Sequence, residues 1–199
     1  MIRTGDRGPM KRRAYTKKTR ALSEAETRRR IIDATVALHE EHGPARTTVS
    51  AIAERAGVQR LTVYRHFPDE LTIFSSCSAR WSESHSPPDL SSLRSAAGRP
   101  RVREILVALY GYYRGGEKML AHLQADAEAL PAIAKLMEPF RDYLDALVGE
   151  LEGSWPRCSG RRRTTIRFAV QFTTWRSLSQ LTSGDREIAD LVLRWIDHT

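Results

Sequence analysis

The stretch from Thr47 to Phe67 decides the fold, and it reads TTVSAIAERAGVQRLTVYRHF. Its opening threonines suit a helix N-terminus, because a threonine hydroxyl accepts a hydrogen bond from a backbone N–H that lacks a partner within the helix. Gly57 then permits a sharp turn, and Val58 fills the angle between two helices. Apolar residues at helical spacing mark both helices, namely Val49, Ile52, Ala53 and Ala56 in the first and Leu61, Tyr64 and Phe67 in the second.

The second helix of this corner carries polar side chains that suit DNA recognition. Hydrogen-bonding and cationic groups of this kind reach base edges and phosphates in a major groove, and the helix offers Gln59, Arg60, Thr62, Arg65 and His66. A helical corner with glycine in its turn also occurs in enzymes and scaffolds. The corner alone therefore leaves these other functions open.

The flanks of the corner favour DNA binding, since AERAG followed by TVYRHFP at this spacing resembles the DNA-binding domain of the TetR family. The resemblance runs from about Thr27 to Trp81. It implies an all-helical, homodimeric repressor whose second corner helix reads a palindromic operator and whose C-terminal domain dimerises and holds an inducer. In that family the positions of Tyr64 and His66 often hold phosphates, while those of Arg60 and Thr62 approach bases. The residues expected to contact DNA are Thr48, Ser50, Gln59, Arg60, Leu61, Thr62, Tyr64, Arg65 and His66.

The sequence departs from the family at two positions. The family commonly carries a lysine where Glu70 stands and often an arginine where Ser50 stands, so this chain lacks two cations that would hold the DNA backbone. Both departures put the usual phosphate contacts in doubt.

The net charge of +8 is concentrated in residues 1–23, which we expect to form a flexible basic arm. Such an arm would neutralise phosphates and add salt-sensitive affinity for any DNA sequence, in place of the missing cations. The alternatives are a solvated tail, or a start at Met10 that leaves residues 1–9 outside the natural protein. The arm contains only Asp6 as an acidic residue against Arg3, Arg7, Lys11, Arg12, Arg13, Lys17, Lys18 and Arg20.

A chain of 199 residues suits a DNA-reading module followed by a larger core, and we place these at residues 24–81 and 82–199. No apolar run is long enough to cross a bilayer, and the N-terminus lacks the apolar segment of a secretory signal. These features predict a cytoplasmic protein without a membrane partner. Cys77 and Cys158 are then expected to be free thiols, with a redox switch as the less favoured alternative.

Helical periodicity predicts about nine helices in an all-α fold. A support helix over about residues 25–42 precedes the corner, and a helix over 68–81 follows it. Arg28, Arg29 and Arg30 then lie in the first turns of the support helix, where cations oppose the helix dipole unless phosphate is near. His39 and His42 are read as cations at its C-terminal end rather than as metal ligands. After a loop over 82–98, the remaining helices are expected over about 100–115, 117–130, 131–153, 162–181 and 185–199.

The last two helices present more apolar surface than one packing partner needs, which favours an isologous dimer interface over an internal core. The C-terminal domain also holds more aromatic and methionine side chains than a minimal bundle needs. A largely apolar inducer cavity is therefore expected, with a tightly packed core as the alternative. Asp126 or Glu128 would pair with a cationic ligand, although both are more simply solvated. The cavity-lining residues are expected among Tyr110, Tyr113, Met119, Leu123, Met137, Phe140, Phe172 and Trp175.

Three functions are weighed against one another. A ligand-released repressor is favoured, with the helix over 68–81 carrying the signal between the domains. An enzyme is disfavoured, because the chain shows no nucleophile elbow, phosphate loop, metal-spaced cluster or paired carboxylates, and no cofactor or metal is expected. A ligand-free architectural DNA-binding protein is disfavoured by the aromatic C-terminal half.

Overall fold

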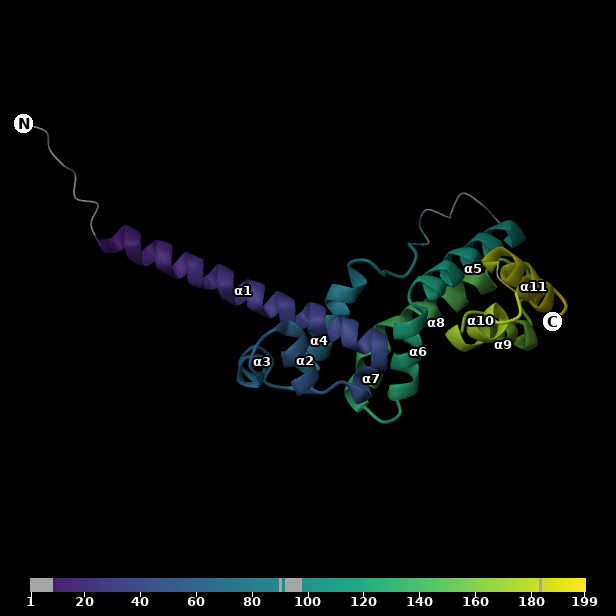
Figure 1. Ribbon diagram of the computed structural model, residues 1–199. Helices are drawn as coiled ribbons and strands as arrows, with labels where there is room; N and C mark the ends of the chain where they lie inside the picture. The colour runs from purple at the N-terminus through teal and green to yellow at the C-terminus, as the bar shows by residue number, and fades with distance from the viewer. Residues whose placement is uncertain (1–8, 90, 92–97, 183) are drawn as a thin grey trace, which may run out of the picture.

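The computed structural model describes residues 9–89, 91, 98–182 and 184–199, and every regular element in these ranges is helical. This confirms the all-α fold, with the DNA-binding helices and the C-terminal helices lying side by side in Figure 1. The elements are α1 (Pro9–His42), the short 3-10 helix η1 (Pro44–Arg46), α2 (Val49–Ala56), α3 (Arg60–His66), α4 (Glu70–Ser82), α5 (Gly98–Gly115), α6 (Glu117–Asp126), α7 (Pro131–Leu136), α8 (Glu138–Glu152), α9 (Gly160–Ala169), α10 (Phe172–Ser179) and α11 (Asp185–Asp197).

Helix α1 is far longer than the support helix expected from the sequence. It begins at Pro9 rather than near Ala25, so the expectation of a flexible arm is wrong for residues 9–23, while residues 1–8 lie outside the described ranges. Proline suits the first turn of a helix, and no glycine or further proline occurs before Gly43, whose φ of 84° ends the helix. Figure 1 shows the N-terminal part of α1 projecting beyond α2, α3 and α4.

The DNA-binding helices share one apolar core. Ile31, Ala34 and Leu38 of α1 are buried as expected, and the hydroxyl of buried Thr35 donates to the Ile31 carbonyl at 2.7 Å. On α3, however, Leu61 and Tyr64 are 68% and 47% exposed, and the buried residues are Val63 and the following Phe67. Of the three apolar positions noted on this helix, only Phe67 is therefore buried, while Leu61 and Tyr64 are accessible for the DNA contacts expected of them.

The C-terminal helices enclose a second core. The apolar stripe of α5 is almost completely buried, and it packs mainly against α11. Trp81, at the end of α4, belongs to this second core rather than to the first. Its ring lies against Gly116, where an added Cβ would come within 2.8 Å of the indole, so the close approach requires glycine.

Two expected helices are each divided in two, which accounts for the difference between about nine expected helices and the eleven α-helices of the described ranges. The first break lies at Met137, because Pro139 lacks a backbone N–H and its ring would clash with the carbonyl of Lys135 in a continuous helix. The second break lies between α9 and α10. There the hydroxyls of Tyr110 and Tyr113 donate to the carbonyls of Ala169 and Val170 at 2.9 and 2.5 Å, which satisfies backbone groups that the break leaves unpaired.

The two cores are joined through α6 and α7. Ile133 of α7 is buried in the DNA-binding core, and α6 and α7 pack on α1 and α4 respectively. The Asp126 side chain, at the end of α6, accepts a hydrogen bond from the Ala45 backbone N–H of η1 at 2.8 Å. Helix α6 therefore contacts the segment that leads directly into α2.

Candidate functional site

The corner between α2 and α3 is held by local hydrogen bonds. Thr48 caps α2, since its hydroxyl accepts from the Ala51 N–H at 3.2 Å, as the sequence predicts. Gly57 ends α2 with a left-handed φ of 63°, a conformation that favours glycine. The Arg30 guanidinium of α1 donates to the carbonyls of Ala56 and Gly57, so α1 fixes the angle at which α3 leaves α2.

The residues expected to contact DNA all lie on the accessible part of this corner. Gln59, Arg60, Leu61, Tyr64 and Arg65 are exposed, and Thr62 and His66 are half-buried. Thr48 and Ser50 are exposed at the start of α2. Within the ranges that the structure describes, no carboxylate pairs with the guanidinium of Arg60 or Arg65, whereas Arg55 on α2 pairs with Glu41. Helix α3 thus presents two uncompensated cations beside its polar side chains.

The arginines expected at the first turns of the support helix have structural partners instead. Arg28 donates to the Ser76 hydroxyl at 3.0 Å and stacks on the ring of Phe67, and Arg29 pairs with Glu26. Because α1 begins at Pro9, Arg28, Arg29 and Arg30 lie in the middle of the helix. The three arginines therefore do not oppose the helix dipole, and this argument for phosphate binding does not apply to them.

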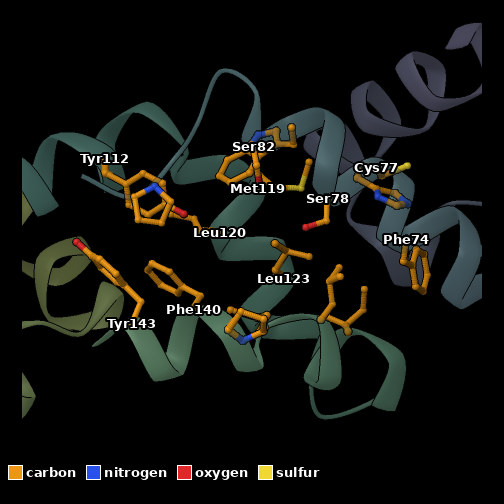
Figure 2. Close-up of a pocket in the computed structure, with 17 residues that line it drawn as sticks. Phe74, Cys77, Ser78, Ser82, Tyr112, Met119, Leu120, Leu123, Phe140 and Tyr143 are labelled. Atoms are coloured by element: carbon orange, nitrogen blue, oxygen red, sulfur yellow. The ribbon is translucent and has the colours of Figure 1, made fainter. Parts of the chain in front are cut away.

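A largely apolar cavity of about 330 Å³ lies between the DNA-binding helices and the C-terminal helices. Figure 2 shows Phe74, Cys77 and Ser78 on one side, Tyr112, Phe140 and Tyr143 on the other, and Leu123 between them. Its volume and apolar walls fit a small-molecule site. The cavity is lined by His39, Phe74, Cys77, Ser78, Trp81, Ser82, Pro87, Tyr112, Met119, Leu120, Leu123, Ile133, Leu136, Met137, Pro139, Phe140 and Tyr143.

The structure brings together half of the residues expected to line a cavity. Met119, Leu123, Met137 and Phe140 line it, but Tyr110, Tyr113, Phe172 and Trp175 do not. These four aromatic residues lie in the C-terminal core, where Tyr110, Tyr113 and Trp175 are completely buried. The Trp175 indole donates to Asp185 at 3.0 Å, so its polar atom has a partner within the core.

Several lining residues were not expected from the sequence. His39 is buried against Phe74, with ring centroids 5.5 Å apart, and burial lowers the pKa of its imidazole to about 4. The ring is therefore neutral at pH 7, and the reading of His39 as a helix-terminal cation was wrong. Burial also raises the pKa of the Cys77 thiol to about 12, which keeps it protonated. Asp126 and Glu128 do not line the cavity.

Other candidate sites have simpler explanations. Cys77 and Cys158 are both free thiols. No group of three or more metal-ligating side chains occurs in the described part of the chain. None of the helices in the described ranges is long and apolar enough to cross a membrane.

Comparison with known proteins identifies the corner. Residues 31–75 match the family described as "Bacterial regulatory proteins, tetR family". The HTH-type transcriptional repressor KstR of Rhodococcus jostii (strain RHA1) is 41% identical over 58 residues, which are 29% of this chain and 27% of that protein. The sequence match thus spans about a quarter of the repressor's length. A family of regulatory proteins agrees with the expectation of a regulator rather than an enzyme.

The fold is similar to solved structures over most of the chain. A TetR-like transcriptional regulator from Rhodococcus sp. RHA1 has a TM-score of 0.62 at 17% identity, over 85% of this chain and 93% of that one. The regulator FadR of Bacillus subtilis, in complex with stearoyl-CoA, has a TM-score of 0.55 at 21% identity, over 84% and 96% of the two chains. The sequence match and the shared helical fold lead to one conclusion, which is that residues 31–75 form a DNA-binding domain of the TetR type within a chain whose fold is TetR-like.

Proposed function

We propose that the protein is a transcriptional repressor that binds a palindromic operator as a homodimer and is released when a small, largely apolar molecule enters the cavity. The observation that carries this proposal is the shared wall. Helix α1 packs on α2 and α4, both α1 and α4 contribute to the apolar core of the α2–α3 corner, and both also line the cavity. A molecule that displaces either helix would move α3. Access to chromosomal DNA would place the protein in the cytoplasm.

The DNA contacts are assigned to α3 on the basis of its free cations and polar side chains. The start of α4 offers no cation for a phosphate, because the residues exposed there, Asp69 and Glu70, are acidic. Asp69 instead caps α4 by accepting from the Thr72 N–H at 2.7 Å, which lowers the pKa of its carboxyl. Phosphate binding is therefore assigned to Tyr64, His66 and the basic N-terminal part of α1.

The homodimer is supported by exposed apolar side chains near the C-terminus. Phe168 of α9, Leu181 after α10 and Trp195 of α11 are all accessible to solvent in one protomer. Two copies that meet through these helices would bury these side chains and place two α3 helices on one operator.

Replacing both Phe168 and Trp195 by glutamate is expected to give a monomer, because an interface cannot bury unpaired carboxylates without a large cost. Sedimentation equilibrium measures the mass, and operator affinity should fall in parallel. Leu71→Glu is the matched control, since Leu71 is an exposed apolar residue of α4. An unchanged dimer mass for the double variant would show that the interface lies elsewhere.

Acyl-CoA is a second candidate ligand, because FadR of Bacillus subtilis holds stearoyl-CoA. The acyl chain suits the apolar walls of the cavity. The phosphates of CoA do not, because the described residues that line the cavity include no lysine or arginine. An uncharged apolar molecule is therefore preferred.

Filling the cavity tests the ligand part of the proposal. Leu123→Trp is expected to abolish ligand-induced release of the operator while leaving ligand-free DNA affinity nearly unchanged, because Leu123 lies between the two sides of the cavity and belongs to α6 rather than to the α2–α3 corner. Compounds that raise the melting temperature of the wild-type chain are tested for operator release by fluorescence anisotropy. Gln124→Trp, at an exposed position of the same helix, is the control, and Phe140→Ala enlarges the cavity in case the larger side chain prevents folding. If Leu123→Trp and Phe140→Ala both released the operator fully at the ligand concentrations that release the wild-type chain, the cavity would not be the ligand site.

A further inference from the structure

His39 is the buried polar side chain of the cavity wall that has no hydrogen-bond partner. It is 4% exposed and lines the cavity from α1, and no described residue donates to or accepts from its ring. Its one ring contact is with Phe74, and its nitrogens are not among the fully enclosed, unpartnered side-chain atoms of the described residues, so they have access to the cavity. An imidazole without a protein partner offers these nitrogens to a molecule that occupies the cavity.

Three other buried side chains with polar atoms do have partners. Thr35 donates to the Ile31 carbonyl and Thr174 to the Phe168 carbonyl, both at 2.7 Å. Trp81, which also lines the cavity, donates from its indole to Glu40 at 3.2 Å. His39 differs from these three side chains because no described residue hydrogen-bonds its ring.

A ligand that covers the His39 nitrogens without hydrogen-bonding them would be penalised. Burying a polar group without a hydrogen bond costs more than burying an apolar group of the same shape. The environment also keeps the ring uncharged, since burial lowers the pKa of His39 to about 4 despite the opposing effect of Asp126. A neutral imidazole offers one N–H donor and one acceptor nitrogen.

We propose that His39 is the polar anchor of the ligand, whose otherwise apolar body carries an uncharged hydroxyl or carbonyl oxygen that hydrogen-bonds the imidazole. This inference rests on the proposed function and names the ligand class of the same cavity. Ser78 lies one helical turn after Phe74 on α4, and both side chains line the cavity. Its hydroxyl points into the cavity in Figure 2, so α4 contributes a second hydrogen-bonding group to the cavity wall.

The surroundings of His39 disfavour charged ligands. A carboxylate in this cavity would meet a neutral imidazole and no cation among the described lining residues. A cationic ligand would need a carboxylate in the wall. The nearby Asp126 does not line the cavity and accepts the Ala45 N–H instead. A buried charge without a partner is strongly unfavourable, so the anchor selects neutral oxygen groups.

A matched series of ten-carbon probes tests the head group directly. Decanol, decane, decanoate and decylamine compete with the neutral dye Nile red, whose fluorescence reports occupancy of the cavity in the full chain. Decanol is expected to displace the dye at a concentration about tenfold lower than decane, as one hydrogen bond to a buried group allows. Decanoate and decylamine are expected to compete less well than decanol.

Two variants assign the preference to His39. His39→Phe keeps an aromatic ring against Phe74 but removes both nitrogens, so decanol should weaken about tenfold while decane is unchanged or stronger. His39→Gln restores a donor and an acceptor and should recover part of the preference.

The outcomes separate this inference from the proposed function. If Leu123→Trp abolishes displacement but His39→Phe keeps the wild-type preference for decanol over decane, the anchor is wrong and the cavity stands. A wild-type preference for decanoate or decylamine would also overturn the anchor. If neither Nile red nor any probe binds the wild-type chain, the cavity holds no ligand, and both the proposed function and the anchor fail.

Discussion

Arg60→Ala is expected to weaken operator binding by about 1–3 kcal/mol per half-site and to relax the preference at one base pair in each half. Arg60 lies at the start of α3, is exposed and has no carboxylate partner among the described residues. The proposed dimer would use the side chain twice, so the total loss should be about 2–6 kcal/mol, or about one and a half to four orders of magnitude in affinity. Fluorescence anisotropy with the wild-type operator and its single-base variants measures both effects.

Two matched variants separate base reading from charge. Arg186→Ala removes an equal charge from an exposed site on α11 and should leave operator binding unchanged. Tyr64→Phe removes a hydroxyl expected to hold a phosphate, so all DNA sequences should weaken alike. Wild-type affinity and base preference in Arg60→Ala would show that Arg60 does not read bases.

Deletion of Met1 to Arg20 is expected to lower affinity for all DNA sequences and to flatten its dependence on salt. Each phosphate that this segment neutralises contributes about 0.9 to the slope of log affinity against log salt. Arg20 and Thr27 of α1 line a surface groove together with Thr62, Arg65 and His66 of α3. The basic part of α1 therefore starts beside α3 and projects outward, where it can follow the DNA backbone.

A charge-only variant is the control for this deletion. Replacing Arg12, Arg13, Lys17 and Lys18 by glutamine removes the charges with a residue that favours helices about as well as lysine. The same flattening of the salt dependence is expected, with base preference retained. An unchanged slope in both variants would show that the N-terminal part of α1 makes no phosphate contact.

The sequence was most informative where one local signal acts on one element. The Thr48 cap, the Gly57 turn and the α5 stripe ending at Tyr113 all lie where residue type and spacing place them. Pro139 is a clear local signal for the break before it, but the apolar stripe over residues 131–153 favoured one continuous helix. The long α1 was also predictable, because no helix-breaking residue occurs between Pro9 and Gly43.

Other features depend on contacts between distant segments, so periodicity does not reveal them. The break after Ala169 contains no glycine or proline, and it is stabilised by tyrosine hydroxyls from α5. Aromatic residues in a stripe were expected to line a cavity, but the stripe of α5 faces the tight core. The cavity is lined by Tyr112, which lies off that stripe.

The position of His39 had a weak local signal. It follows Thr35 by four residues, on a face of α1 that is otherwise buried, which indicates an inward-facing ring rather than an exposed cation. That the ring lines a cavity, rather than a packed core, depends on α4, α6 and α7 together. Only the fold places these helices around it.

Selection of bound sequences from random duplex DNA by the full-length protein tests the central claim most directly. Two α3 helices in a symmetric dimer predict an inverted repeat whose half-site centres lie about 10 base pairs, or a multiple of one turn, apart. Enrichment of such a palindrome by the wild-type chain, and its loss or degeneration with Arg60→Ala, is the expected result. Recovery of no common sequence, or of the same sequence by both proteins, would contradict operator recognition by α3.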